Sequence, residues 1–576
     1  MKKKFFKSTV VAITLLWSGL GAQSQTLKEA IHLMYSEQFD VAKKTFSSLL
    51  SKEPKNGDNY FYFGECYIYS YIIDSISSSL DDVADSAFYY YKKGTEVEPY
   101  NPLNYTGLGK VELLRKNTEK AKTYFDKAIS FLPSKTNKNS ELSVEKQVLT
   151  YAEIADAYIR VNPPDLKQAF AYVQLAQTMT THNPAIYIIY GDVYLESGDA
   201  TNAIANYKKA QDLDPLSPLA KIKIGNIYVR GRSLKAAIPY FEEAQTIDPN
   251  FAPAYREMGE LYIKSGMYEK AKENYSKFLE LSHRNISARI KYIYALFLCK
   301  DYENVILQIK DVMTSDSSSI TLYRLGGYSY YETEKYDEAK KYMEIFFKKV
   351  NPQRIISSDY AYFGRILSKM GNDSLAVEYF YKAISKDTSN YDLLSETAIL
   401  LIKENKGLEA IPLYDKKINN GKAASLDYYY LTKIYFSLYQ NLSANPLYAK
   451  TDSLLNKGKE YLIKADTLCG SFLAMQPNSM QGLQRKAQIK AALDPDFKLG
   501  LAKPFYEKVL SKAQTDSVKY TNELIESYDY FGWYYYSTEQ NYPLSKMYYK
   551  RIIAIDPKNA KAKNALNLPK LKALPN

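Results

Sequence analysis

The chain has 576 residues with 76 basic and 64 acidic side chains, which gives a formal net charge of +12. The first 24 residues hold four lysines and no acid, so the remainder carries 72 bases against 64 acids, a charge of +8. Positive and negative side chains are interspersed, a pattern typical of solvated helix faces, and this argues against a nucleic-acid-binding protein.

A secretory signal peptide is predicted at residues 1–24. Lysines at positions 2, 3, 4 and 7 precede an apolar run over 10–20, and Ala22 and Ser24 provide the small residues that precede a cleavage site. The run is shorter than the roughly 20 residues that span a bilayer, and no cysteine near Ser24 offers a lipid attachment point. We therefore expect an exported, periplasmic protein that begins at Gln25 and has no lipid anchor or membrane segment.

A spacing of small and large residues recurs over 25–133. Each copy has a small residue, a second small residue twelve positions later and an aromatic ring four positions beyond that. The second copy carries an insertion near 70–85 between its two small residues. The residues of these three copies are Ala30, Ala42 and Phe46; Gly64, Ala87 and Tyr91; and Gly109, Ala121 and Phe125.

The same spacing is most regular over 134–385. After a polar segment at 134–139, which we expect to be a surface loop, one copy is centred on Ala155. Five further copies follow in register, at one constant period and without an insertion, and one more follows after three extra residues. The first small or apolar positions of the five are Gly191, Gly225, Gly259, Ile293 and Gly327.

This pattern resembles the tetratricopeptide repeat (TPR), a helix–turn–helix unit of about 34 residues with small residues at fixed places and aromatic residues beside them. The resemblance implies an all-α solenoid that winds as a right-handed superhelix. A physical argument supports the stacking, because a single helix pair leaves an apolar face bare and pairs must pack together to cover it. Gly198 and Gly266 are expected in the turns between paired helices.

More degenerate copies are expected over 386–576. Their small residues fall at Ala398, Thr432, Ala487 and Gly532, and about twenty extra residues replace the turn near 440–460. A lysine-rich helix is expected to close the end, because a solenoid needs a polar terminal face. The sequence thus predicts about 14 repeats plus a C-terminal capping helix.

Cysteine and tyrosine usage also fits a repeat core. Cys66, Cys299 and Cys469 are too many repeats apart to reach the roughly 7 Å that a disulfide allows, so we expect buried single thiols. Tyrosines number 57 against 23 phenylalanines. The tyrosine clusters at 428–430 and 534–536 either line contacts between repeats or face a partner, and we favour the first interpretation.

No catalytic constellation is recognisable in the sequence. His32, His182 and His283 lie in different repeats and form no metal-ligating pair. Phosphate-binding glycine motifs and calcium-loop spacing are missing, and no stretch of roughly 100 residues remains for a catalytic domain. We therefore expect no enzyme activity, no cofactor and no metal site.

Partner-binding residues are expected on the first helix of each pair, which lines a concave groove in the TPR family. The resemblance implies that motif positions 5, 9, 12 and 13 point into this groove. Such a mixed surface suits an extended peptide, because arginine and tyrosine anchor side chains while asparagine bonds the backbone. The candidate residues are Asp192, Asn226, Arg230, Arg256, Glu260, Lys264, Tyr294, Arg324, Tyr328, Tyr331 and Arg365.

The expected function is that of a non-enzymatic scaffold or adaptor that binds proteins or extended peptides through this groove, in envelope or secretion-complex assembly. Two alternatives are open. The abundant tyrosine and the basic tail after Asp556 would suit a cell-wall or carbohydrate-binding module. The second alternative is a regulatory subunit or a secreted effector. It stays open because function in a repeat fold depends on the groove residues, so the fold alone does not decide between these roles.

Overall fold

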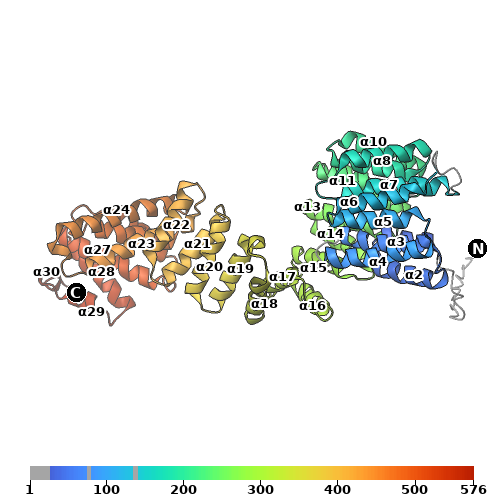
Figure 1. The fold of residues 1–576 in the computed structure, drawn as a ribbon. Helices are drawn as coiled ribbons and strands as arrows, with labels where there is room; N and C mark the ends of the chain where they lie inside the picture. Colours follow the sequence, from blue (N-terminus) through green and yellow to red (C-terminus); the bar gives the residue numbers. More distant parts are fainter. Residues whose placement is uncertain (1–25, 74–78, 134–140, 576) are drawn as a thin grey trace, which may run out of the picture. The chain divides into compact units, whose positions relative to one another are not determined.

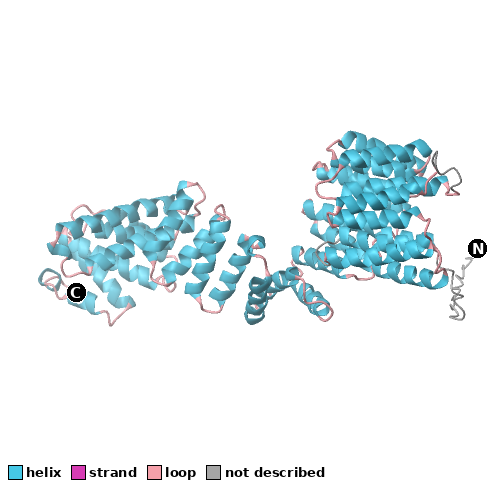
Figure 2. Ribbon diagram, in the orientation of Figure 1, coloured by secondary structure: helices cyan, strands magenta, loops and turns pink. Residues whose placement is uncertain are grey.

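The computed structural model describes residues 26–73, 79–133 and 141–575, which contain helices and no strand (Figure 2). Three sequence predictions fall wholly or partly outside these residues: the signal peptide at 1–24, the polar segment at 134–139, and the first insertion, of which 74–78 is not described. Within the described ranges, none of the helices combines the length and the apolar character that crossing a bilayer requires.

The described helices follow one another as fourteen helix–turn–helix pairs, and two short helices close the C-terminal end (Figure 1). Each pair coincides with one predicted repeat. The predicted all-α repeat fold, with about 14 repeats and a C-terminal cap, is therefore confirmed for the part of the chain that the structure describes.

The first of two compact units extends to Phe346. Its last helix runs three residues past that boundary. The helices of this unit are α1 (Leu27–Tyr35), α2 (Phe39–Lys52), α3 (Gly57–Ile73), α4 (Leu80–Val97), α5 (Pro102–Leu114), α6 (Thr118–Ser130), α7 (Val144–Arg160), α8 (Leu166–Met179), α9 (Pro184–Glu196), α10 (Ala200–Leu213), α11 (Leu219–Arg230), α12 (Leu234–Ile247), α13 (Ala252–Lys264), α14 (Tyr268–Leu281), α15 (Ile286–Leu298), α16 (Tyr302–Met313), α17 (Ile320–Glu332) and α18 (Tyr336–Lys349).

The second unit begins at Phe347. The predicted boundaries at 133 and 385 divide the repeats into an N-terminal, a central and a more degenerate C-terminal group, and they stay predictions. The helices of the second unit are α19 (Ser357–Lys369), α20 (Asp373–Lys386), α21 (Tyr391–Lys403), α22 (Gly407–Asn419), α23 (Ser425–Ser443), α24 (Asp452–Met475), α25 (Met480–Leu493), α26 (Lys503–Ala513), α27 (Thr521–Ser537), α28 (Tyr542–Ile555), α29 (Ala560–Leu566) and α30 (Pro569–Lys572).

Local sequence explains where α9 begins and where the paired helices turn. The side chain of Asn183 accepts a hydrogen bond from the backbone N–H of Ala185 at 2.9 Å, and Pro184 occupies the first helical position, where its missing N–H costs nothing. Gly198 and Gly266 follow α9 and α13 with φ of 83° and 71°. Glycine adopts these left-handed values without strain, so the predicted turns are confirmed.

The small residues of the repeat lie where two helices touch. A Cβ atom added at Gly259 of α13 would lie 2.7 Å from Cε1 of Tyr275 in α14, and the Tyr275 side chain is 2 % exposed. A glycine opposite a buried ring lets the two backbones approach closely. The regular spacing of glycine and aromatic residues therefore marks the positions at which the two helices of one pair contact each other.

Substituting alanine for Gly259 should destabilise the repeat. Overpacking a buried site costs roughly 1–3 kcal/mol, and alanine regains at most about 1 kcal/mol through helix propensity. Thermal unfolding of the full chain, with hydrogen exchange at α13 and α14, measures the loss. The matched control is Gly231→Ala, where an added Cβ would meet no atom closer than 3.5 Å. Equal stability of both variants would refute the close-packing explanation.

The helices on either side of both insertions are long in the part of the chain that the structure describes. In the second unit, α23 and α24 reach 19 and 24 residues, with a short 3-10 helix at Tyr448–Lys450 between them. In the first unit, α3 continues to Ile73 and α4 begins at Leu80. The second insertion therefore extends its two paired helices beyond the length of the neighbouring ones and adds the 3-10 helix.

The tyrosine clusters pack between helices, both within a repeat and between repeats. Within one helix pair, Tyr535 stacks on Tyr548 with ring centroids 5.7 Å apart, and the rings of Tyr429 and Phe472 lie 5.2 Å apart. Between repeats, as the favoured interpretation holds, Tyr430 stacks on Tyr414 of the preceding pair with ring centroids 6.5 Å apart. Burial of the thiols is confirmed for two of the three cysteines. Cys299 is only partly buried, and it caps the C-terminal end of α15.

Candidate functional site

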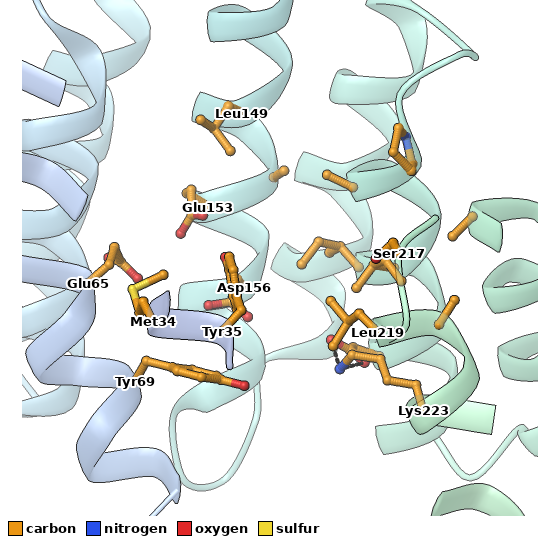
Figure 3. A pocket seen from close by; sticks show the side chains of 18 of the residues that line it. Met34, Tyr35, Glu65, Tyr69, Leu149, Glu153, Asp156, Ser217, Leu219 and Lys223 are labelled. Carbon is orange, nitrogen blue, oxygen red and sulfur yellow. Dashed lines mark hydrogen bonds and ion pairs between the residues drawn. The ribbon is translucent and has the colours of Figure 1, made fainter. Parts of the chain in front are cut away.

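A cavity of about 290 Å³ lies among the first helices of several pairs in the first unit (Figure 3). We call it the main cavity. Helices α3, α7, α9 and α11 contribute most of its wall, and Met34 and Tyr35 at the end of α1 line one side. Its charged lining residues are Glu65, Glu153, Asp156, Arg160, Asp192, Asp214 and Lys223.

Lys110 on α5 joins three carboxylates of the main cavity. Its side chain is 1 % exposed, and its Nζ lies 2.8 Å from Glu65, 2.6 Å from Glu153 and 3.4 Å from Asp156. Burial alone would lower the pKa of Lys110, but these carboxylates outweigh burial and raise it above its usual value. The lysine is therefore a fixed positive charge behind the cavity wall.

The pKa values of the two cavity acids on α7, Glu153 and Asp156, are shifted in opposite directions. Burial raises the pKa of Glu153 to about 7, although Lys110 opposes the shift. Burial would also raise the pKa of Asp156, but Arg160 and Lys110 outweigh it and lower that pKa to about 2. The Arg160 Nε donates a hydrogen bond to Asp156 at 2.6 Å. At neutral pH, Asp156 is therefore ionised, whereas Glu153 is protonated in a fraction of the molecules.

Glu153 should make the stability of the first unit fall as the pH rises. Its pKa is about 7 when folded against the usual 4.5, so the folded state binds this proton more tightly. The contribution is fully present below pH 4.5 and is lost between pH 4.5 and 7, by up to about 3 kcal/mol.

Melting temperatures of Glu153→Gln across this pH range should show a smaller decline than those of the unsubstituted protein. Glu303→Gln is the control, since that side chain is 70 % exposed. A decline of the same size in Glu153→Gln would contradict the assignment.

Charged pairs link the first helices of consecutive repeats. Each pair joins motif position 9 to position 6 of the next repeat, 31 residues later in regular repeats. Lys110 and Glu153 make the same connection across a longer repeat. The three regular pairs are Asp192–Lys223 at 2.6 Å, Glu260–Lys291 at 2.5 Å and Arg365–Glu396 at 2.6 Å. Asp192, Glu260 and Arg365, all predicted to contact a partner, thus already bond to neighbouring repeats.

Arg256 is held by the turn between α1 and α2. Its guanidinium donates to both carboxylate oxygens of Glu37, with Nε–Oε2 at 2.9 Å and Nη2–Oε1 at 2.8 Å. The Glu37 side chain is 1 % exposed. Nearby, Tyr35 packs against the core cluster that includes α13 and α14, and Gln38 lies 3.3 Å from His283. This predicted site residue therefore contacts the chain's own N-terminal turn.

The structure brings Asp192, Asn226 and Arg230 together. With Arg160 they line a second hollow of about 230 Å³, which we call the side hollow and which shares several residues with the main cavity. The Arg230 side chain is 64 % exposed and lies 3.6 Å from Glu196. This part of the predicted set forms one accessible surface.

Two further candidates lie on the surface of the same unit. Lys264 ends α13 and is exposed, and Tyr294 on α15 is 42 % exposed. Both can reach a partner, as predicted for groove residues. Their binding role stays a prediction.

The three candidates on α17 pack against other helices of the unit. Tyr328 was expected to present its ring at the groove, but it is only 5 % exposed because the ring lies against α15. The contacts are Arg324 over the Phe346 ring at 4.9 Å, Tyr328 with Phe297 at 6.0 Å and Tyr331 with Tyr336 at 6.0 Å.

Sequence reasoning missed the acids and the lysine that build the main cavity. Glu65, Lys110 and Asp156 occupy motif position 9 of the second, third and fourth repeats, and Glu153 occupies position 6 of the fourth. The predicted groove residues come only from the more central repeats, between Asp192 and Arg365. Extending position 9 toward the N-terminus, and checking for an opposite charge at position 6 of the next repeat, would have indicated these residues.

Two family models match parts of the chain. One is described as the ARM repeat of tetratricopeptide repeat protein 21 and matches residues 100–237, and a tetratricopeptide repeat model matches residues 252–284. No curated protein matches the chain.

Several solved structures are similar to this chain. The C-terminal part of a TPR repeat-containing protein from Cytophaga hutchinsonii is 30 % identical over 48 % of this chain and 100 % of its own, with a TM-score of 0.39. A tetratricopeptide repeat protein from Parabacteroides merdae is 18 % identical over 45 % of this chain and 99 % of its own, with a TM-score of 0.32. YrrB, described as a TPR protein with an unusual peptide-binding site, is 18 % identical over 33 % of this chain and 96 % of its own, with a TM-score of 0.29.

Proposed function

Because the chain belongs to the tetratricopeptide repeat family, we propose that it is a non-enzymatic scaffold that binds other proteins through the first helices of its first unit. The partner would be an exported protein of the envelope or of a secretion complex, since the N-terminal 24 residues have the pattern of a signal peptide. The observation that carries the proposal is the side hollow, where Asp192, Asn226 and Arg230 meet on one accessible surface.

The side hollow has the chemistry that an extended peptide needs. Arg230 is a mostly exposed cation that can pair with a carboxylate. The Asn226 amide offers both a donor and an acceptor for a peptide backbone. Lys264 and Tyr294 extend the accessible set to α13 and α15. Arg256 contributes less, because Glu37 already satisfies its guanidinium.

Crosslinking in cells tests this proposal. A photoreactive residue at position 230 or 294 should capture one distinct protein, because both positions are exposed on first helices. The same residue at Lys208, an exposed position on the second helix α10, is the matched control. Mass spectrometry then identifies the product. Equal, diffuse crosslinking from all three positions would show that the first-helix surface is not the binding surface.

A further inference from the structure

Acidic side chains outnumber basic side chains in the main cavity, whether or not Lys110 behind the wall is included. Helices α3, α7 and α9 and the residue that follows α10 provide five carboxyl groups, and two basic side chains line the cavity. Lys110, behind the wall, adds a third positive charge. The carboxyl groups are Glu65, Glu153, Asp156, Asp192 and Asp214, and the lining bases are Arg160 and Lys223.

The three bases are already engaged with these acids. Arg160 bonds Asp156 at 2.6 Å, and Lys223 bonds Asp192 at 2.6 Å. Lys110 is shared by three carboxylates. Within the lining, the local charge is therefore negative whenever all five carboxyl groups are ionised. The pKa of Glu153, raised to about 7, agrees with this imbalance, because burial and the neighbouring acids Glu65 and Asp156 all favour the neutral form.

Apart from Ser217, the rest of the wall is apolar and aromatic. Ile68, Leu149, Ile188, Ile189 and Leu219 line it, together with the ring of Tyr35 (Figure 3). At its edge, Ile72 on α3 is 37 % exposed, which places this part of the lining at the protein surface. A volume of about 290 Å³ is near the lower end of the range of small-ligand sites.

We propose that the main cavity binds a cationic group on an apolar stem, an alkylammonium or a guanidinium, with Glu153 and Glu65 receiving the charge. The stem would lie along the isoleucines and leucines, and the cation would replace the proton of Glu153. An anion would meet five carboxyl groups, and a neutral ligand would leave the charge imbalance in place. The inference deepens the proposed function and rests on it where the cation is a lysine or arginine side chain of the bound protein. A free alkylamine is the other source of the same chemistry.

Calorimetric titration of the full chain with three six-carbon probes tests the charge preference. Hexylamine should bind, whereas hexanol and hexanoate should not. Glu153→Gln and Glu65→Gln should each weaken hexylamine binding about tenfold or more, the size expected for a lost charge-assisted contact. Glu303→Gln is the control, because that acid lies on α16 outside the cavity lining. Hexanoate binding as tightly as hexylamine would overturn the inference, and the comparison of probes needs no variant to fold.

The crosslinking experiment separates the two sources and the two proposals. If excess hexylamine reduces capture from position 230, the cation belongs to the bound protein. If hexylamine binds without reducing capture, the site takes a free amine. Specific capture from position 230 without any hexylamine binding overturns the cation site and leaves the scaffold function intact. Hexylamine binding without specific capture from position 230 or 294 overturns the scaffold function alone.

Discussion

Lys110→Met should destabilise the first unit by about 3–5 kcal/mol, the cost of removing one partner from a buried ion cluster. The substitution leaves Glu65, Glu153 and Asp156 beside one another without the lysine that bonds all three. Methionine has nearly the length of lysine, so the loss of charge outweighs the loss of volume.

Hydrogen exchange on the full chain locates this effect. Protection should fall in α3, α5 and α7, which carry the four groups, and should persist in α21 and α22 of the second unit. Lys122→Met is the matched control, because the Lys122–Asp126 pair is 63 % and 55 % exposed and exposed pairs contribute little to stability. Unchanged protection in Lys110→Met would mean that the carboxyl groups are neutral without the lysine and need no counter-charge.

Arg256→Gln should release the N-terminal turn from α13. The substitution leaves the Glu37 carboxylate, which is 1 % exposed, without its ion-pair partner. If the turn stays in place, this should lower the free energy of unfolding by about 3–5 kcal/mol. Opening of the turn lets Glu37 regain water, so α1 is expected to exchange its amide hydrogens rapidly while α9 and α10 stay protected.

A double-variant cycle checks that the pair itself is responsible. Glu37→Gln combined with Arg256→Gln should cost less than the sum of the single variants, because neither charge is then left alone. Arg230→Gln, which removes a largely exposed pair with Glu196, should leave α1 protected. If the losses of stability in the two single variants simply add in the double variant, the ion pair is not responsible, and the loss comes from packing around Tyr35 instead.

The fold could be predicted from the sequence because each repeat carries its own packing signal. Gly259 lies opposite Tyr275, and the same small-to-aromatic spacing marks the contact within the other pairs. Such contacts are local, so a constant repeat period was enough to place the helices and their turns. The division between Phe346 and Phe347 lies close to the three extra residues that interrupt the constant period after the copy at Gly327, but the period itself does not distinguish such an interruption from a boundary between units.

The candidate site was predicted only in part because groove positions do not reveal what a side chain contacts. Position 9 indicated Asp192, which lines both hollows, but its bond to Lys223 requires the neighbouring repeat to be considered. The Glu37–Arg256 contact lay beyond any motif, since it joins a turn residue to a helix 219 residues later. Charge complementarity between repeats is visible in the sequence, whereas the return of the N-terminal turn to α13 depends on the path of the whole unit.

The separation of 219 residues between Glu37 and Arg256 also has a consequence for biosynthesis. A ribosome adds about 5–20 residues per second, so Arg256 is made roughly 10–45 seconds after Glu37. The first helix pairs can stack on one another during that time, because their contacts are between neighbours. The turn that contains Glu37 can form its ion pair only after Arg256 has been synthesised. The packing of the first unit is therefore completed by a contact between its N-terminal turn and a much later segment.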